Sequence, residues 1–178
     1  MSIYVKVGIL VGMLIGIIIV TFFMKFTKKD GDMKCKYDER QANVRGKGYK
    51  LSFFTLFIYN AIYGLLGIMI EKRYVDSLAA MMIGICLAVA VYAVYCIWND
   101  AYFSLNENPR RVIIGFGLIA LLNLLLGVMN LYDGMVITDG MLNYRSVNLI
   151  CGVLFIIIFI TLILKANNNK HRRQYEES

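Results

Sequence analysis

Residues 77–98 read SLAAMMIGICLAVAVYAVYCIW, a run without one charged side chain. A helix of about 20 such residues crosses the hydrocarbon core of a bilayer, because it bonds its own backbone amides internally and presents apolar side chains to lipid. Four further apolar runs of about this length are residues 3–24, 51–70, 112–131 and 147–165, with Lys6 and Lys165 close to the ends of the first and the last. The sequence therefore predicts an all-α integral membrane protein whose single domain, residues 1–178, is a bundle of five transmembrane helices.

The composition also indicates that the chain lies in a lipid bilayer, which is its expected partner. Hydrophobic residues make up 59% of the chain and charged residues 17%, so a water-soluble domain would lack polar residues to cover its surface. The net charge is +7, but Lys and Arg flank the apolar runs, where topology and lipid headgroups account for them. No basic stripe with interleaved aromatic residues stands apart from the runs, so we expect no nucleic-acid partner.

The distribution of Lys and Arg predicts the orientation. Segments 25–50, 99–111 and 166–178, the last with the preceding Lys165, carry 9, 2 and 4 of them, whereas the N-terminal end, 71–76 and 132–146 carry 1, 2 and 1. Cytoplasmic segments of membrane proteins carry the excess of Lys and Arg. We therefore expect the first group of segments in the cytoplasm, the N-terminus outside and the C-terminus inside.

Helix starts are marked by capping residues. Asp38 and Gln41 have the spacing of a capping box, in which each side chain binds the other residue's backbone N–H. Asn108 can cap a helix that has Pro109 at its first position, where the missing N–H costs nothing. These signals predict that one helix begins well before residue 51 and another begins at Pro109.

The connections outside the predicted spans are short. Residues 71–76, EKRYVD, force the second and third helices to be antiparallel neighbours. Asp133-Gly134 and Asp139-Gly140 are turn signals on either side of the β-prone residues 135–138, which predicts a small hairpin-like excursion.

Small residues recur at helical spacing in two of the spans. Gly8, Gly12 and Gly16 place a glycine face on the first helix, where a neighbouring backbone can approach closely. This face can dock on the protein's own bundle or on another chain. Ala80, Gly84 and Ala88 form a weaker ridge on the third helix and are a candidate internal partner for the first.

A charged stretch, KYDERQANVRGKGYK at 36–50, separates the first two apolar runs. We hypothesise that residues 38–45 dock on residues 99–111, with Arg40 and Arg45 facing the acidic residues there and Glu39 facing the arginines. The alternative is a solvated juxtamembrane collar that obeys the positive-inside rule. The proposed cytoplasmic polar cluster consists of Asp38, Glu39, Arg40, Arg45, Asp100, Arg110 and Arg111.

Polar side chains inside the predicted spans include Asn60, Tyr63, Tyr92, Tyr95 and Asn123. Amides in hydrocarbon seek partners, so we expect Asn60 and Asn123 to point into the bundle and bond between helices. The alternative is a polar cavity within the bundle that these five side chains line.

Signals for catalysis or metal binding are weak. No Asp, Glu, Lys, Arg or His lies deep in a span, which disfavours pumps, proton-coupled transporters and voltage sensors. The chain has one histidine, His171 in the polar tail, and no CxxC motif. No nucleophile has a base beside it, and the carboxylates form no recognisable acid and base pair. We therefore expect no enzymatic activity, no cofactor and no metal.

The stretch YDERQANVRGKGYKLSFFTLFIYN resembles small bacterial and archaeal multi-pass membrane proteins that share a juxtamembrane Asp-Glu-Arg signature. Asp38, Glu39 and Arg40 are the matching positions, and the resemblance covers about one seventh of the chain. It implies a prokaryotic cytoplasmic-membrane protein without assigned chemistry.

From these observations we expect a non-enzymatic accessory or interaction protein. It would assemble as a homo-oligomer or within a larger membrane complex, through helix packing and the cytoplasmic polar cluster. The alternative is a small transporter-like or ligand-binding membrane protein with a polar cavity in its bundle.

Overall fold

The structure is a computed structural model that describes residues 3–30, 32, 34–70 and 72–176. It is mostly helical (77%). Its long helices are α1 (Ile3–Thr27), α2 (Glu39–Met69), α3 (Ser77–Trp98), α4 (Pro109–Tyr132) and α5 (Val147–Glu176). Each contains a stretch long and apolar enough to cross a membrane. The expected helical class and the five long apolar helices are confirmed.

The start of α2 follows the predicted capping box. The Asp38 carboxylate accepts the backbone N–H of Gln41 at 2.6 Å, and the Gln41 side chain accepts the backbone N–H of Asp38 at 3.4 Å. Both caps satisfy amides that have no partner in the first turn of a helix. The helix therefore begins at Glu39, well before the apolar run that starts at Leu51.

The start of α4 also follows a predicted local signal, whereas α5 extends beyond its predicted end. The Asn108 side chain accepts the backbone N–H of Arg110 at 3.1 Å, and Pro109 occupies the first helical position as predicted. The last helix continues from the apolar run into the polar tail as far as Glu176, beyond the expected limit at Lys165.

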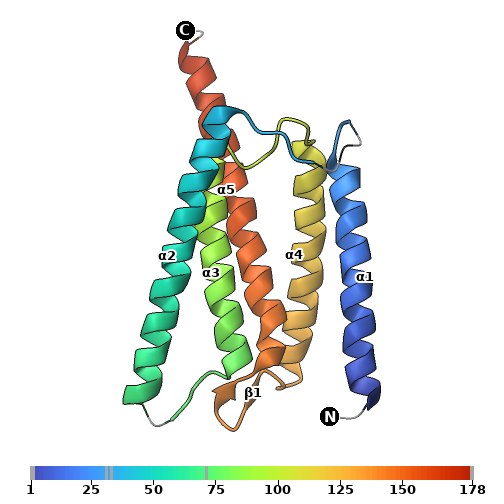
Figure 1. The fold of residues 1–178 in the computed structure, drawn as a ribbon, viewed down its shortest axis with the longest axis vertical. Helices are drawn as coiled ribbons and strands as arrows, with labels where there is room; N and C mark the ends of the chain where they lie inside the picture. Colours follow the sequence, from blue (N-terminus) through green and yellow to red (C-terminus); the bar gives the residue numbers. More distant parts are fainter. Residues whose placement is uncertain (1–2, 31, 33, 71, 177–178) are drawn as a thin grey trace.

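The helices pack side by side in the order α2, α3, α5, α4, α1 (Figure 1). Helices α2 and α3 are neighbours joined by a short connection, which confirms the predicted helical hairpin. Helix α1 lies at the end of the row, next to α4. The buried core lies between α3 and α5 and consists of Cys86, Ala90, Ala93, Ile97, Leu154 and Ile158.

The small-residue ridge of α3 packs on α2. The expectation that this ridge packs on α1 is therefore wrong. The Tyr59 hydroxyl donates to the carbonyl of Ala80 at 2.7 Å, and the Ser52 hydroxyl donates to that of Ala88 at 2.9 Å. A Cβ atom at Gly84 would lie 2.6 Å from the Tyr59 ring. The ridge is filled by a tyrosine of the helix that the short connection holds beside it.

The connection from α4 to α5 forms the predicted hairpin. It contains β1 (Ile137–Thr138), β2 (Met141–Leu142) and the 3₁₀ helix η1 (Tyr144–Ser146). Asp139 and Gly140 both have positive φ values, +52° and +74°, at the turn. The Leu142 N–H donates to Tyr74, and its carbonyl accepts from Asp76, both at 2.8 Å. The two connections at this end of the bundle are therefore bonded to each other.

Candidate functional site

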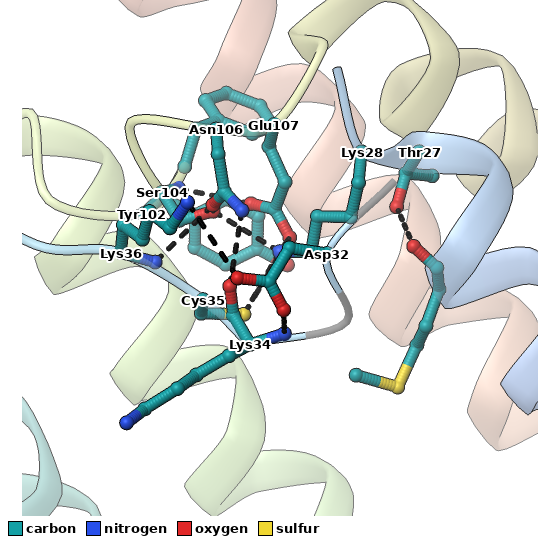
Figure 2. A network of polar contacts seen from close by, with 12 residues as sticks. Thr27, Lys28, Asp32, Lys34, Cys35, Lys36, Tyr102, Ser104, Asn106 and Glu107 are labelled. Carbon is teal, nitrogen blue, oxygen red and sulfur yellow. Dashed lines mark hydrogen bonds and ion pairs between the residues drawn. The ribbon is translucent and has the colours of Figure 1, made fainter. Parts of the chain in front are cut away.

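A buried ion pair joins the connection after α1 to the connection before α4. The Lys28 side chain is 0% exposed, and its Nζ lies 2.9 Å from Oε1 of Glu107. The same Nζ donates to Cys35 Sγ at 2.9 Å and to Ser104 Oγ at 3.2 Å. Figure 2 shows these groups turned toward one another. Each of the three N–H bonds of the ammonium group thus has an acceptor.

The pKa values of the two partners reflect the pairing. Burial disfavours the ammonium form of Lys28, but hydrogen bonds to Cys35 and Glu107 outweigh it and raise the pKa of Lys28 above its ordinary 10.5. Burial also disfavours the Glu107 carboxylate. The backbone N–H of Ser104 and the Lys28 ammonium outweigh that effect and hold the pKa of Glu107 below its ordinary 4.5. Both groups are charged at neutral pH.

Asn106 connects the same two segments through its backbone and its side chain. Its carbonyl accepts the Lys29 N–H at 2.8 Å. Its amide donates to Asp30 at 3.1 Å, and its side-chain oxygen accepts from the Ser104 hydroxyl at 3.0 Å. Asp30 also pairs with Lys36 at 2.7 Å. The hydrogen bond from Lys36, joined by that from Asn106, lowers the pKa of Asp30 to about 2 despite some desolvation.

The first turns of α2 dock on the connection after α3. Three of their side chains donate to backbone carbonyls there. These are Arg40 (to Asn99 and Asp100, 3.0 and 3.3 Å), Gln41 (to Asp100 and Phe103, 3.2 and 3.3 Å) and Arg45 (to Ala101 and Tyr102, 3.3 and 3.4 Å). The structure therefore brings residues 38–45 against residues 99–103. Carbonyls beyond the end of a helix have no helical donor, which makes them ready acceptors.

Tyrosine rings surround the guanidinium of Arg45. Its central carbon lies 4.0 Å from the ring centroid of Tyr37 and 5.5 Å from that of Tyr92. The Tyr92 ring also stacks on Tyr49, with centroids 4.6 Å apart. Tyr92 therefore belongs to this contact between α2 and α3. Stacking over aromatic rings suits the planar, weakly hydrated guanidinium.

The side-chain ion pairs expected within the cluster do not form. Asp100 pairs with Lys165 of α5 at 2.9 Å, not with an arginine of α2. No salt bridge joins Glu39 to Arg110 or Arg111 among the described residues, and Arg111 donates to the Phe26 carbonyl at 3.0 Å. Sequence spacing alone could not reveal that carbonyls and a distant lysine compete for these groups.

The buried centre at Lys28, Ser104 and Asn106 was absent from the expected cluster. A signal was nevertheless present, because residues 104–107 have the S/T-x-x-E spacing typical of a capping box. The Glu107 carboxylate does accept the backbone N–H of Ser104 at 2.9 Å. Lys28 had no comparable signal, since a lysine after an apolar run is an ordinary headgroup residue.

Polar side chains within the helices do not converge on a common cavity. Asn60 and Asn123 each donate to the carbonyl four residues earlier on their own helix, at 2.9 Å. The expectation that these amides bond between helices is therefore wrong for both, and Asn60 is exposed, so it does not point into the bundle as expected. Tyr95 lies against Gly48 of α2. Tyr63 lines a separate surface groove at the far end of α2.

The glycine face of α1 is largely unfilled within the chain. Cβ atoms at Gly12 and Gly16 would meet no atom within 4 Å. Seven residues after Gly16, on the same face, Phe23 packs so closely on Gly115 of α4 that no side chain could fit there. The surroundings of Gly8 lie outside the described residues. Helix α1 is therefore anchored to α4 near one end, while its glycines remain open.

Ser104 and Lys28 invite comparison with catalytic serine and lysine pairs. A lysine that activates a serine must be a neutral base. Lys28 instead carries a raised pKa and an ion pair, and Ser104 is only 4% exposed. Residues 3–30, 32, 34–70 and 72–176 contain no group of three or more His, Cys, Asp or Glu side chains placed to bind a metal. The chemistry of these groups fits a structural role, in which they hold the connection after α1 against the connection before α4.

No protein-family model, curated protein or solved structure matches this chain. The resemblance through Asp38, Glu39 and Arg40 therefore stays a prediction.

Proposed function

We propose that this chain is a multi-pass protein of a prokaryotic cytoplasmic membrane with a non-enzymatic accessory role. It assembles with a second copy of itself or with a larger membrane complex through the glycine face of α1. Two sets of polar contacts hold the cytoplasmic ends of its own helices together. One joins residues 38–45 to residues 99–103, and the other is centred on the ion pair of Lys28 and Glu107. The N-terminus lies outside and the C-terminus inside.

The observation that carries this proposal is the open glycine face. In lipid, helices associate through close van der Waals contact, for which glycine leaves the most room. A glycine face that served only the chain's own bundle would be covered by a neighbouring helix. At Gly12 and Gly16 no neighbouring atom lies within 4 Å of the place where a Cβ atom would stand, although Phe23 on the same face packs tightly on α4.

The orientation is supported by the positions of the basic segments. The described residues of segment 25–50, segment 99–111 and the end of α5 lie at the same end of the bundle (Figure 1). These segments carry most of the Lys and Arg residues. Moving them across a membrane would be far more costly than leaving them in the cytoplasm.

The transporter-like alternative has less support. It requires Asn60, Tyr63, Tyr92, Tyr95 and Asn123 to line one hydrated cavity. The two amides bond to their own helices. Tyr92 and Tyr95 lie against Gly48, whereas Tyr63 lines a groove at the far end of α2. An enzymatic role also has less support, because a charged Lys28 cannot act as the base that activates Ser104.

The proposal is tested by replacing Gly12 with Leu and measuring self-association and copurification in mild detergent. Tagged and untagged copies are coexpressed, and the untagged copy retained on the tag is quantified. We expect the variant to lose retained copies or retained partner proteins, because a larger side chain separates the helices.

A matched control is Gly117→Leu in α4, since a Cβ atom there also meets nothing within 4 Å. Neither substitution introduces a Cβ clash within the chain, so both variants should retain wild-type thermal stability as monomers. Unchanged assembly in the Gly12 variant, or equal loss in both variants, would refute the proposed contact.

A further inference from the structure

We infer that the groove at the far end of α2 binds one phospholipid with an anionic headgroup. This inference rests on the membrane placement given under Proposed function, but on no other part of it. The groove lies between the last turns of α2 and the start of α3, and has a volume of about 440 Å³.

Two glycines create the space. Gly64 and Gly67 are three residues apart on one face of α2, and a Cβ atom at either would meet nothing within 4 Å. Tyr63, Ile70 and Val75 line the groove beside them. An acyl chain can therefore lie against the helix backbone with apolar side chains on both flanks.

Two cations line the same groove where α2 ends. Lys72 and Arg73 are both exposed, and neither forms a salt bridge with a described residue. The Asp76 carboxylate is occupied by two backbone N–H groups in the first turn of α3, at 2.6 and 2.9 Å. Glu71 lies outside the described residues. An apolar channel that ends at two cations matches an acyl chain that ends at a phosphate.

Other occupants fit less well. A small soluble anion would gain nothing from the apolar walls. A second copy packed about a two-fold axis that passes through the groove would bring Lys72 and Arg73 of both copies close together, because equivalent residues meet at such an axis. Like charges across an interface oppose association. A phospholipid meets both the apolar and the cationic parts of the groove.

A second groove provides an internal comparison. It lies between α3 and α5, has a volume of about 340 Å³, and its lining, which includes Ile83, Leu87 and Val153, contains no charged residue. It should accept acyl chains without preference for a headgroup.

Quenching of tryptophan fluorescence by brominated lipids tests the inference. The only tryptophan, Trp98, is replaced by Phe. A single reporter is then introduced as Tyr74→Trp in the first groove or Val153→Trp in the second. Each full-length variant is reconstituted in phosphatidylcholine vesicles with brominated phosphatidylglycerol or brominated phosphatidylcholine as the quencher.

We expect the Tyr74→Trp reporter to prefer phosphatidylglycerol, and the Val153→Trp reporter to show no preference. Each cation near a lipid surface contributes about fivefold to anionic binding. Lys72→Gln and Arg73→Gln should therefore each reduce the preference by about that factor, and the double variant should abolish it. The matched control, Lys47→Gln with Lys50→Gln at the other end of α2, should leave it unchanged.

Three outcomes would overturn the inference alone, and a fourth would overturn it together with the membrane placement. The first is equal quenching of the Tyr74→Trp reporter by both lipids. The second is a preference that survives the loss of both Lys72 and Arg73. The third is quenching at Val153→Trp but not at Tyr74→Trp by either lipid, which would mean that protein covers the groove. If neither reporter is quenched, the membrane placement itself fails and the inference fails with it.

Discussion

Replacing Lys28 with Met removes one partner of the buried ion pair. The Lys28 side chain is 0% exposed and that of Glu107 18% exposed, so little water can replace the lost ammonium group. Breaking a buried pair in this way costs about 3–5 kcal/mol. Because Glu107 keeps the Ser104 N–H at 2.9 Å, we expect a loss near the lower end, about 3 kcal/mol in the free energy of unfolding.

The double variant Lys28→Met with Glu107→Leu separates charge pairing from packing. Removing both charges avoids an unpaired buried carboxylate, so the double variant should recover most of the loss. Unfolding in mixed detergent micelles with increasing SDS, followed by circular dichroism, measures all four proteins of the cycle. A loss below about 1 kcal/mol in the single variant, or additive losses in the double variant, would refute the buried pair.

The pH dependence of stability gives an independent readout of the same pair. The folded-state pKa of Glu107 is lowered, so its contribution is present above pH 4.5 and is lost as the pH falls through the folded value. The folded-state pKa of Lys28 is raised, so its contribution is fully present below pH 10.5 and is lost as the pH rises through the folded value. Stability from the pair should form a plateau between those limits, and the double variant should lack this component.

Three further predictions concern helix packing, capping and orientation. Gly127→Ala should lower the free energy of unfolding by about 1–3 kcal/mol, because its Cβ atom would lie 2.9 Å from the backbone of α5. Gly117→Ala on the same helix should leave that free energy unchanged or raise it by up to about 1 kcal/mol. Equal stability of the two variants in SDS unfolding would contradict the close approach at Gly127. Asp38→Ala should lose about 0.5–2 kcal/mol through the missing cap of α2, and an unchanged SDS midpoint would show that the capping box contributes nothing. In a chain without native cysteines, Asp139→Cys should react with an impermeant maleimide on intact cells and Lys47→Cys only after permeabilisation; the reverse pattern would invert the proposed orientation.

Helix positions and starts were predictable because their causes are local. Apolar runs of bilayer length, the Asp38 and Gln41 capping box and the Asn108-Pro109 start each lie within one short segment, and all of them appear in the structure. The short connection that forces α2 beside α3 is local in the same sense. Gly48 shows the limit of such reasoning. A glycine inside a helix ordinarily weakens it, yet α2 continues through Gly48, and the missing side chain lets Tyr92, Tyr95 and Cys96 of α3 approach.

The lateral order of the helices and the partners of their polar groups emerged only in three dimensions. A helix apolar on every side has no amphipathic stripe to show which face meets protein and which meets lipid, so nothing along the chain revealed that the ridge at Gly84 faces Tyr59. Lys28 and Glu107 are 79 residues apart in the sequence, and their pairing depends on how α1 and α4 align. Local hydrogen bonding and hydropathy determine where a membrane helix begins and ends, whereas its rotation and its neighbours follow from side-chain shapes that match only across the assembled bundle.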